Sequence, residues 1–263
     1  MKASRSSFNL AWLSKGLFTV FLFFVYAPLF VLVVFSFNDS AILTFPLKGF
    51  TLRWYEQFFG SGTILQAVVN SLTLGGSVAL IATAMAILAS FAIVRYNFRG
   101  KAVFSYLIIM PMVIPYIIMG VSLLIFFSYL GFELSLFTVL LSHTLVALPF
   151  ATLVLVARLI GFDKSLEEAA MDLGADELTT FRKVTLPLMF PGVLAATMIS
   201  FLISFEDVVL AFFTIGYQPT IPIYILGQLR HPTNLPILTA ITVFMLFIST
   251  GIVILSYLVR KFE

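Results

Sequence analysis

Acidic side chains are the groups of this sequence most able to do chemistry, and they are unevenly distributed. Asp and Glu number twelve in 263 residues, and charged residues make up only 10% of the chain. Six of the twelve acids lie between residues 163 and 177. A run of charges is most often a solvated loop, and the alternative is a surface that docks a partner. The six are Asp163, Glu167, Glu168, Asp172, Asp176 and Glu177.

Two further acids, Glu206 and Asp207, stand inside an apolar stretch. Carboxylates in such surroundings are costly and usually mark a pathway, so we expect a site for an amine-bearing solute. The alternative is that they face outer water or pair with an Arg of a neighbouring chain. Neighbouring residues of a helix point about 100° apart, so we expect only one of the two to line the pathway. The other side chains considered for the pathway, with ordinary packing as the alternative, are Phe201, Phe205, His143 and Tyr224.

Several kinds of chemistry are excluded by what the sequence lacks. It has no cysteine, so disulfides and thiolate metal sites are ruled out. It has no G-x-x-x-x-G-K-[ST] phosphate loop, so this chain is not expected to bind ATP in that manner. Two-aspartate proteolysis needs acids on facing helices, whereas the acids of the apolar stretch are adjacent in sequence. We therefore expect neither an enzyme nor a metal site.

The elements that must carry these residues are long and apolar. Hydrophobic residues make up 61% of the chain and its mean hydropathy is +1.11, well beyond the balance of a soluble domain. The lipid bilayer is therefore the expected solvent, and about 20 apolar residues make one spanning helix. Continuous rather than alternating apolar runs argue against a β-barrel. An all-α polytopic membrane protein with six transmembrane helices is predicted, with spans at 17–37, 67–94, 103–129, 135–157, 188–213 and 236–259.

Lys and Arg predict the orientation of these spans. With the N-terminus inside the cell, twelve basic residues lie on the inner side and three, Lys48, Arg53 and Arg230, on the outer side. This bias predicts that both termini are cytoplasmic, and it explains the net charge of +3 without a nucleic acid. The loop 158–187 is then cytoplasmic. The outer loops are 38–65 and 214–235, and the inner basic residues are Lys2, Arg5, Lys15, Arg95, Arg99, Lys101, Arg158, Lys164, Arg182, Lys183, Arg260 and Lys261.

Local signals give the cytoplasmic loop two short helices. Ser165 followed by Glu168 fits a capping box that starts a helix, and Gly174 stands where a left-handed C-cap is expected. Asp176 can cap a second helix, and Pro187 begins the next span at a position that tolerates proline. The loop is thus expected to be a helix–turn–helix beneath the membrane. Its apolar stripe consists of Leu166, Ala169, Ala170 and Leu173.

The spacing of residues within this loop is specific. Glu168-Ala169-Ala170 is followed after three residues by Gly174, and after nine more by Val184-x-Leu186-Pro187. This pattern resembles the EAA loop of ABC-importer permeases, EAA-x3-G-x9-I-x-LP, with Val184 in place of Ile. Four other stretches extend the likeness to the spermidine/putrescine permeases over almost the full length; they are 36–59, 95–101, 111–115 and 204–216.

The resemblance implies a type I ABC-importer permease fold, as a single domain over 1–263, in the bacterial cytoplasmic (inner) membrane. In that family the EAA loop forms a coupling helix seated on an ATP-binding subunit. ATP and Mg would therefore be bound by a partner ATPase, and this chain would need no cofactor. The implied partners are two ATPase copies, a second related permease chain, an extracytoplasmic solute-binding protein and membrane lipid, with no nucleic acid. The residues implied in ATPase coupling are Glu168, Ala169, Ala170, Gly174, Leu186 and Pro187.

The implied activity is import of a small organic solute, most simply a polyamine such as putrescine or spermidine, through a pathway of which this chain forms half. An opine or an aminophosphonate is the alternative solute, because the soluble binding protein sets much of the specificity. Trp54 and Tyr55 are expected to contact that binding protein or, alternatively, to anchor the outer loop at the membrane surface. A stand-alone secondary transporter is the rival class. It would leave the acidic loop unexplained, and no inverted repeat with matched broken helices is visible.

Overall fold

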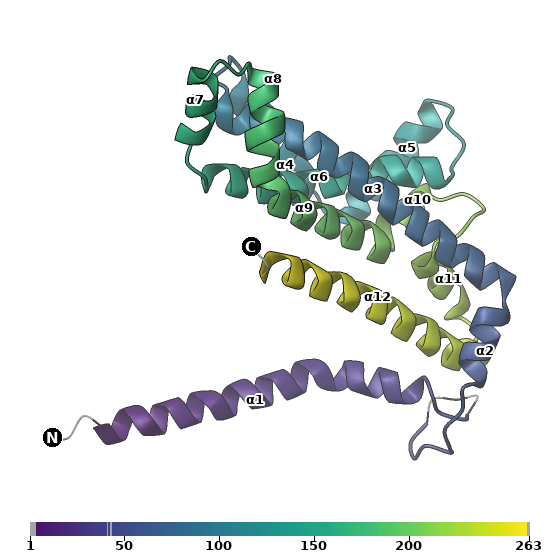
Figure 1. Cartoon of the computed structure of the whole chain (residues 1–263). Helices are drawn as coiled ribbons and strands as arrows, with labels where there is room; N and C mark the ends of the chain where they lie inside the picture. Colours follow the sequence, from purple (N-terminus) through teal and green to yellow (C-terminus); the bar gives the residue numbers. More distant parts are fainter. Residues whose placement is uncertain (1–3, 41, 43, 262–263) are drawn as a thin grey trace. The chain divides into compact units, whose positions relative to one another are not determined.

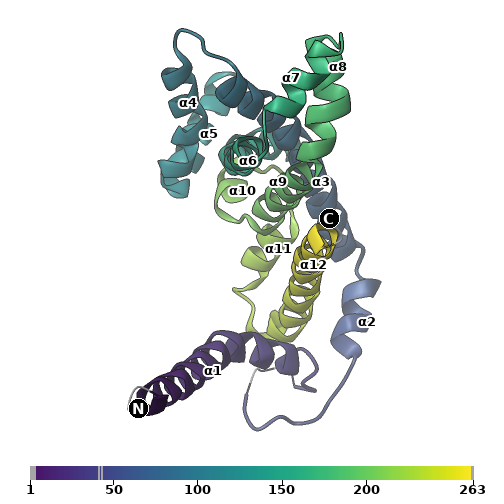
Figure 2. The same ribbon diagram turned by 60° about the vertical axis from the view of Figure 1, so that its left-hand side comes forward.

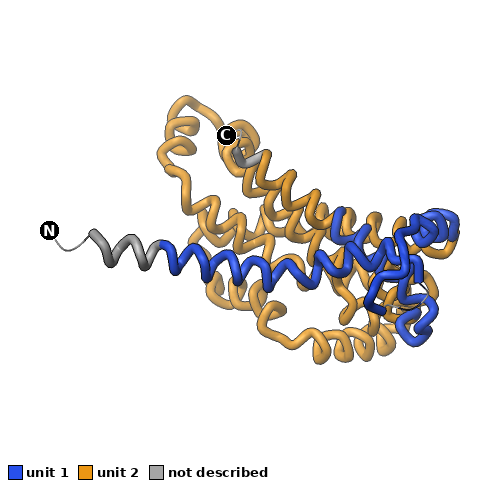
Figure 3. The backbone as a smooth tube through the Cα atoms, turned by 90° about the horizontal axis from the view of Figure 1, so that it is seen from below, with its two compact units in different colours: residues 1–61, 228–247 blue, residues 62–227, 248–263 orange. Residues whose placement is uncertain are grey.

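The computed structural model describes residues 4–40, 42 and 44–261, and Lys2, one of the basic residues expected on the inner side, lies outside them. Within these residues the fold is all-helical, as predicted, apart from one isolated bridge between Asn38 and Phe50. In the described part of the chain five helices are long and apolar enough to cross a membrane, or six if one bent pair counts as a span. The chain forms two compact units, which Figure 3 colours separately.

The first unit comprises residues 1–61 and 228–247. Its longest helix, α1 (Ser4–Phe35), carries an apolar stretch, Trp12–Phe35, that is long enough to cross a membrane. The unit also holds α2 (Arg53–Gly60), the 3-10 turn η2 (Pro232–Asn234) and the first half of α12 (Leu235–Lys261).

The second unit comprises residues 62–227 and 248–263. Three long helices form its centre and lie side by side in Figures 1 and 2: α3 (Gly62–Arg95), α6 (Leu136–Ile160) and α9 (Leu186–Glu206). Small residues allow the close approach of these helices. The contact faces include fully buried alanines, Ala82 and Ala86 on α3, Ala147 and Ala151 on α6, and Ala196 on α9.

The third expected span, 103–129, is bent rather than straight. Its two halves, α4 (Lys101–Val113) and α5 (Tyr116–Tyr129), meet at an angle of 108°. The break lies at Pro115, which has no N–H to donate and which forces the preceding Ile114 into extended backbone with ψ 128°. The second half packs against α6 and against a short helix that follows α9.

The fifth expected span, 188–213, is interrupted near its far end. The helix α9 ends at Glu206, and Asp207 is extended with ψ 128° before the chain resumes as α10 (Val209–Thr214). A further short helix, α11 (Ile221–Gln228), lies within the expected outer loop 214–235. The interruption separates the two adjacent acids, one at the end of a helix and the other in the break.

Candidate functional site

The EAA loop, residues 158–187, folds into the expected helix–turn–helix: α7 (Ser165–Asp172), α8 (Glu177–Thr180) and a π-helical turn, η1 (Phe181–Thr185), that runs into α9. The expected capping box of Ser165 and Glu168 does not form. Instead Asp163 Oδ1 accepts a hydrogen bond from the Ser165 N–H at 2.9 Å and so caps α7. That backbone hydrogen bond is the main reason that the pKa of Asp163 lies below its ordinary value.

The turn between the two short helices forms as the sequence predicts. Gly174 adopts the left-handed region with φ +94°, and the N–H of Ala175 donates to the Ala170 carbonyl at 3.1 Å, which closes α7. Asp176 caps α8 by accepting from the Thr179 N–H at 3.3 Å. The hydrogen bonds from Thr179 hold the pKa of Asp176 below its ordinary value. The second helix therefore starts where a cap was predicted.

One face of α7 is exposed in the described part of the chain. Leu166 is 47% exposed and Leu173 is 91% exposed, so the predicted apolar stripe is directed at least in part to the surroundings. Glu168 and Ala169 are exposed beside them, and the Glu168 carboxylate pairs with Lys164 at 3.0 Å. At the end of the loop Leu186 is half-buried and Pro187 is exposed. An exposed apolar and acidic face of this kind is available to a partner.

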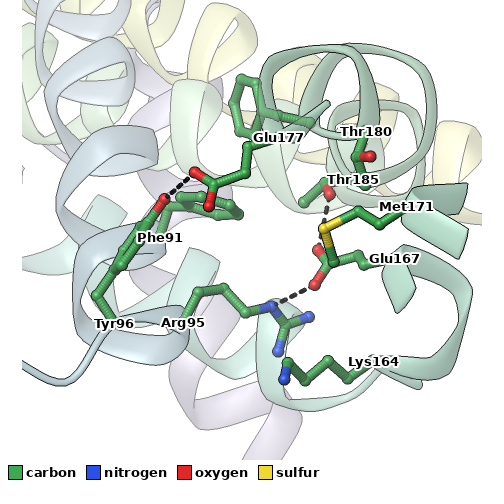
Figure 4. Close-up of a pocket in the computed structure, with 10 residues that line it drawn as sticks. Phe91, Arg95, Tyr96, Lys164, Glu167, Met171, Glu177, Thr180 and Thr185 are labelled. Atoms are coloured by element: carbon green, nitrogen blue, oxygen red, sulfur yellow. Dashed lines mark hydrogen bonds and ion pairs between the residues drawn. The ribbon is translucent and has the colours of Figure 1, made fainter. Parts of the chain in front are cut away.

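Glu167, the neighbour of Glu168, lies on the opposite face and is buried. Its Oε2 is 2.8 Å from Nε of Arg95 at the end of α3, and its Oε1 accepts a hydrogen bond from Thr185 Oγ1 at 2.7 Å. Figure 4 shows these contacts beside a cavity of about 190 Å³. Sequence reasoning assigned roles to Glu168 and Asp176 but none to Glu167. The available signal was an arginine, Arg95, ending a long apolar span without a local acid.

The two acids at the end of α9 have different surroundings. Asp207 Oδ1 accepts from the N–H groups of Leu210 and Ala211 at 2.8 and 3.1 Å, which caps α10. His143 of α6 places Nε2 at 3.3 Å from the same oxygen, and its Nδ1 shares a hydrogen bond of 2.9 Å with Ser204 Oγ. The Asp207 side chain is only 6% exposed. The contacts of Asp207 and His143 thus stabilise the fold at this break.

Glu206, in contrast, is exposed, and among the described residues its side chain makes no hydrogen bond or ion pair. The aromatic residues predicted beside it differ in access. Phe205 is fully buried and stacks on Phe201 at a centroid distance of 5.2 Å, so Phe205 offers no surface to a solute in this conformation. Phe201 and Tyr224 are half-buried. Of the predicted pathway residues, Glu206 is the free carboxylate.

In the first unit, Trp54 and Tyr55 make hydrogen bonds that close the outer loop 38–65, called the outer segment below. Trp54 is 6% exposed and its Nε1 donates to the Asn38 carbonyl at 2.9 Å. The Tyr55 hydroxyl lies 2.7 Å from Ser36 Oγ. Burial leaves Trp54 little surface for the binding-protein contact predicted for it, whereas Tyr55 is half-buried. Among the described residues, no three His, Asp or Glu side chains come together in a way that could hold a metal ion.

Comparison with known sequences connects this geometry to a family. The chain is 38% identical over 247 residues to the spermidine/putrescine transport system permease protein PotC of Haemophilus influenzae, which covers 92% of this chain and 95% of the relative. It is 34% identical over 219 residues to the putrescine transport system permease protein PotI of Escherichia coli, with 80% of this chain and 78% of the relative covered.

Solved structures share the fold. A bacterial ABC transporter that imports the acidic polysaccharide alginate matches with a TM-score of 0.74 at 19% identity, over 97% of each chain. An alginate transporter in complex with its pentasaccharide-bound periplasmic protein matches with a TM-score of 0.71 at 20% identity, over 96% of this chain and 93% of that one.

A family model covers most of the sequence. Residues 80–263 match the model described as binding-protein-dependent transport system inner membrane component. With the full-length relatives and the helical fold, this match assigns the role of the molecule. The chain belongs to the family of binding-protein-dependent transport system inner membrane components, and it is the multi-pass permease component of an ABC importer rather than an enzyme.

Proposed function

We propose that this permease component imports a polyamine and that Glu206 contacts the cationic solute. Two observations support the proposal: relatives that align over most of the chain are named as spermidine/putrescine and putrescine permeases, and the carboxylate at the end of α9 is exposed. A carboxylate attracts the ammonium groups of a polyamine, whereas opines and aminophosphonates also carry anionic groups that it would repel. The half-buried rings of Phe201 and Tyr224 are available for cation–π contact.

We also propose that α7 is the coupling helix and that it docks on a partner ATPase. The exposed face of Leu166, Glu168, Ala169 and Leu173 is the contact surface. Gly174 sets the turn behind it through a left-handed conformation that other residues adopt only with strain. ATP and Mg belong to that partner, and this chain needs no cofactor of its own. Both termini then lie in the cytoplasm, on the same side of the membrane as the EAA loop.

The full assembly has two ATPase copies, a second related permease and an extracytoplasmic solute-binding protein. Tyr55 and the exposed residues of the outer segment, such as Phe45 at 85% and Phe50 at 76%, are the surface we assign to the binding protein. We therefore assign the main contact with the binding protein to this exposed surface and not to the buried Trp54.

Uptake of labelled putrescine and spermidine tests the substrate. Cells expressing the complete operon are compared with cells lacking the ATPase and with the Glu206→Gln variant. Uptake that depends on the ATPase and falls in Glu206→Gln at unchanged protein level supports the polyamine assignment. Wild-type cells that take up neither amine would rule out both polyamines as substrates.

A separate measurement tests the coupling role of α7. The variant Glu168→Lys reverses the charge on the exposed face of α7 without changing the buried contacts of Glu167. We expect it to lower ATP-driven uptake while the chain still inserts into the membrane. Normal uptake in this variant would show that the face does not carry the coupling.

A further inference from the structure

Glu167 joins three segments that are distant along the chain. Among the six acids of the EAA loop, all of which the structure describes, it alone is buried, at 5% exposure. It belongs to α7, its Oε2 contacts Arg95 at the end of α3, and its Oε1 accepts a hydrogen bond from Thr185, the last residue of η1 before α9. Figure 4 shows the carboxylate between the two partners. The pair therefore links the short helix to two of the three central helices.

The surroundings of this pair make it hard to separate. The side chains of Arg95 and Glu167 are 11% and 7% exposed, and the Arg95 guanidinium also lies 4.9 Å from the centre of the Phe162 ring. Pulling such a pair apart would leave a buried charge without its partner, which is strongly unfavourable. The other ties in the region are exposed: Lys164 to Glu168, at 60% and 55% side-chain exposure, and the Tyr96 hydroxyl to the Glu177 carboxylate. Exposed ties of this kind contribute little.

The end of α3 also packs against η1, the turn that leads into α9. Phe91 of α3 and Phe181 of η1 pack edge to face with centroids 5.2 Å apart. The turn η1 is π-helical, a feature frequent at functional sites, and it places the fully buried Thr185 within hydrogen-bonding distance of Glu167. The covalent links of α7 are weaker constraints, because a turn containing Gly174 separates it from α8.

We propose that Arg95, Glu167 and Thr185 form a joint that makes α7 and the adjoining ends of α3 and α9 move as one body. A displacement of α7 by the ATPase then reaches the solute pathway through this joint, not through the flexible turns alone. Glu167 is a positioning residue: it contacts neither ATP nor the solute. This inference rests on the proposed coupling role of α7, and it assigns to Glu167 a task distinct from that of its neighbour Glu168.

The test uses the complete importer in proteoliposomes, with its ATPase, sister permease and binding protein, and measures solute moved per ATP hydrolysed. Glu167→Gln keeps an acceptor for Thr185 but removes the charge that holds Arg95. We expect the ratio to fall at least about fivefold, the lower range of coupling between two sites, while the ATPase still co-purifies. The matched control is Tyr96→Phe, which removes an exposed hydrogen bond between the residue that follows α3 and Glu177 of α8 and should keep the wild-type ratio.

A rescue experiment separates a joint from a merely structural contact. The chain contains no cysteine, so Cys introduced at positions 95 and 167 provides the only thiols of this subunit. In partners free of cysteine, this double variant should be uncoupled, and a short bismaleimide that links the two positions should restore the ratio. If the cross-linked importer stays uncoupled, the proposed joint is wrong, because the proposal requires only that the cross-linked segments move together.

Two further variants keep the outcome decisive. If Glu167→Gln does not assemble, Thr185→Val removes one hydrogen bond and leaves the ion pair, and an unchanged ratio in that variant contradicts the proposal. Glu168→Lys is measured in parallel. If it uncouples transport and Glu167→Gln does not, the joint is wrong and the coupling role of α7 stands. If both variants transport normally, the coupling role of α7 is itself wrong.

Discussion

The adjacent acids Glu206 and Asp207 should respond to substitution in opposite ways. Asp207→Ala removes an oxygen that accepts from two backbone N–H groups at 2.8 and 3.1 Å and that faces His143 at 3.3 Å. Glu206→Gln changes an exposed side chain that makes no hydrogen bond or ion pair with the described part of the chain. We therefore predict that the first variant loses stability and that the second loses affinity for the solute.

The magnitudes follow from the contacts. Loss of a helix N-cap costs about 0.5–2 kcal/mol, and a hydrogen bond to a charged group contributes about 1.5–3 kcal/mol. Both figures describe the same two N–H···Oδ1 bonds to Asp207, so they are not added, and we expect Asp207→Ala to cost about 1.5–3 kcal/mol. Glu206→Gln is expected to change stability by less than about 0.5 kcal/mol. Its loss of one charged contact should weaken solute binding by about tenfold to a hundredfold.

Two assays separate the effects. Thermal unfolding of the purified importer in detergent reports stability, and the concentration dependence of uptake in proteoliposomes reports the apparent affinity for the polyamine. Asp207→Asn is the matched control, since it keeps an oxygen that can cap α10 while removing the charge. The reasoning is refuted if Asp207→Ala unfolds at the wild-type temperature, or if Glu206→Gln reaches half-maximal uptake at the wild-type concentration of polyamine.

Three more predictions concern other parts of the fold. Gly216→Ala would drive a Cβ into the Leu134 carbonyl, so we expect a cost of about 1–3 kcal/mol, visible in thermal unfolding, and a wild-type midpoint would contradict this backbone contact. Trp54→Phe removes the buried donor to the Asn38 carbonyl and should destabilise the outer segment by about 1 kcal/mol, measured by faster hydrogen exchange there. Asp176 has a pKa lowered by folding, so its contribution to the cap of α8 is complete above about pH 4 and is lost as pH falls through the lowered pKa. Proteolysis of the loop should therefore speed up at acid pH in the wild type and show no such onset in Asp176→Asn.

Features that depend on neighbours along the chain could be predicted from the sequence. Apolar runs predicted the helical membrane fold, Gly174 predicted the left-handed turn, and Asp176 predicted the cap of α8. Each of these is set within a few residues, because helix caps and turns are closed by hydrogen bonds to the next turn of backbone. The spacing of the EAA loop indicated the family for the same reason, since it is a property of one continuous segment.

Which acid of each adjacent pair is buried with a partner and which is exposed became visible only in the tertiary structure. Glu167 and Glu168 are both acids of one helix, and only the position of Arg95 on α3 buries the first and leaves the second exposed. Asp207 is likewise separated from Glu206 by an interruption of the helix and by a histidine on another helix. Periodicity tells which residues share a face, but a carboxylate's role depends on the charge or donor placed opposite it, and packing between distant segments supplies that partner.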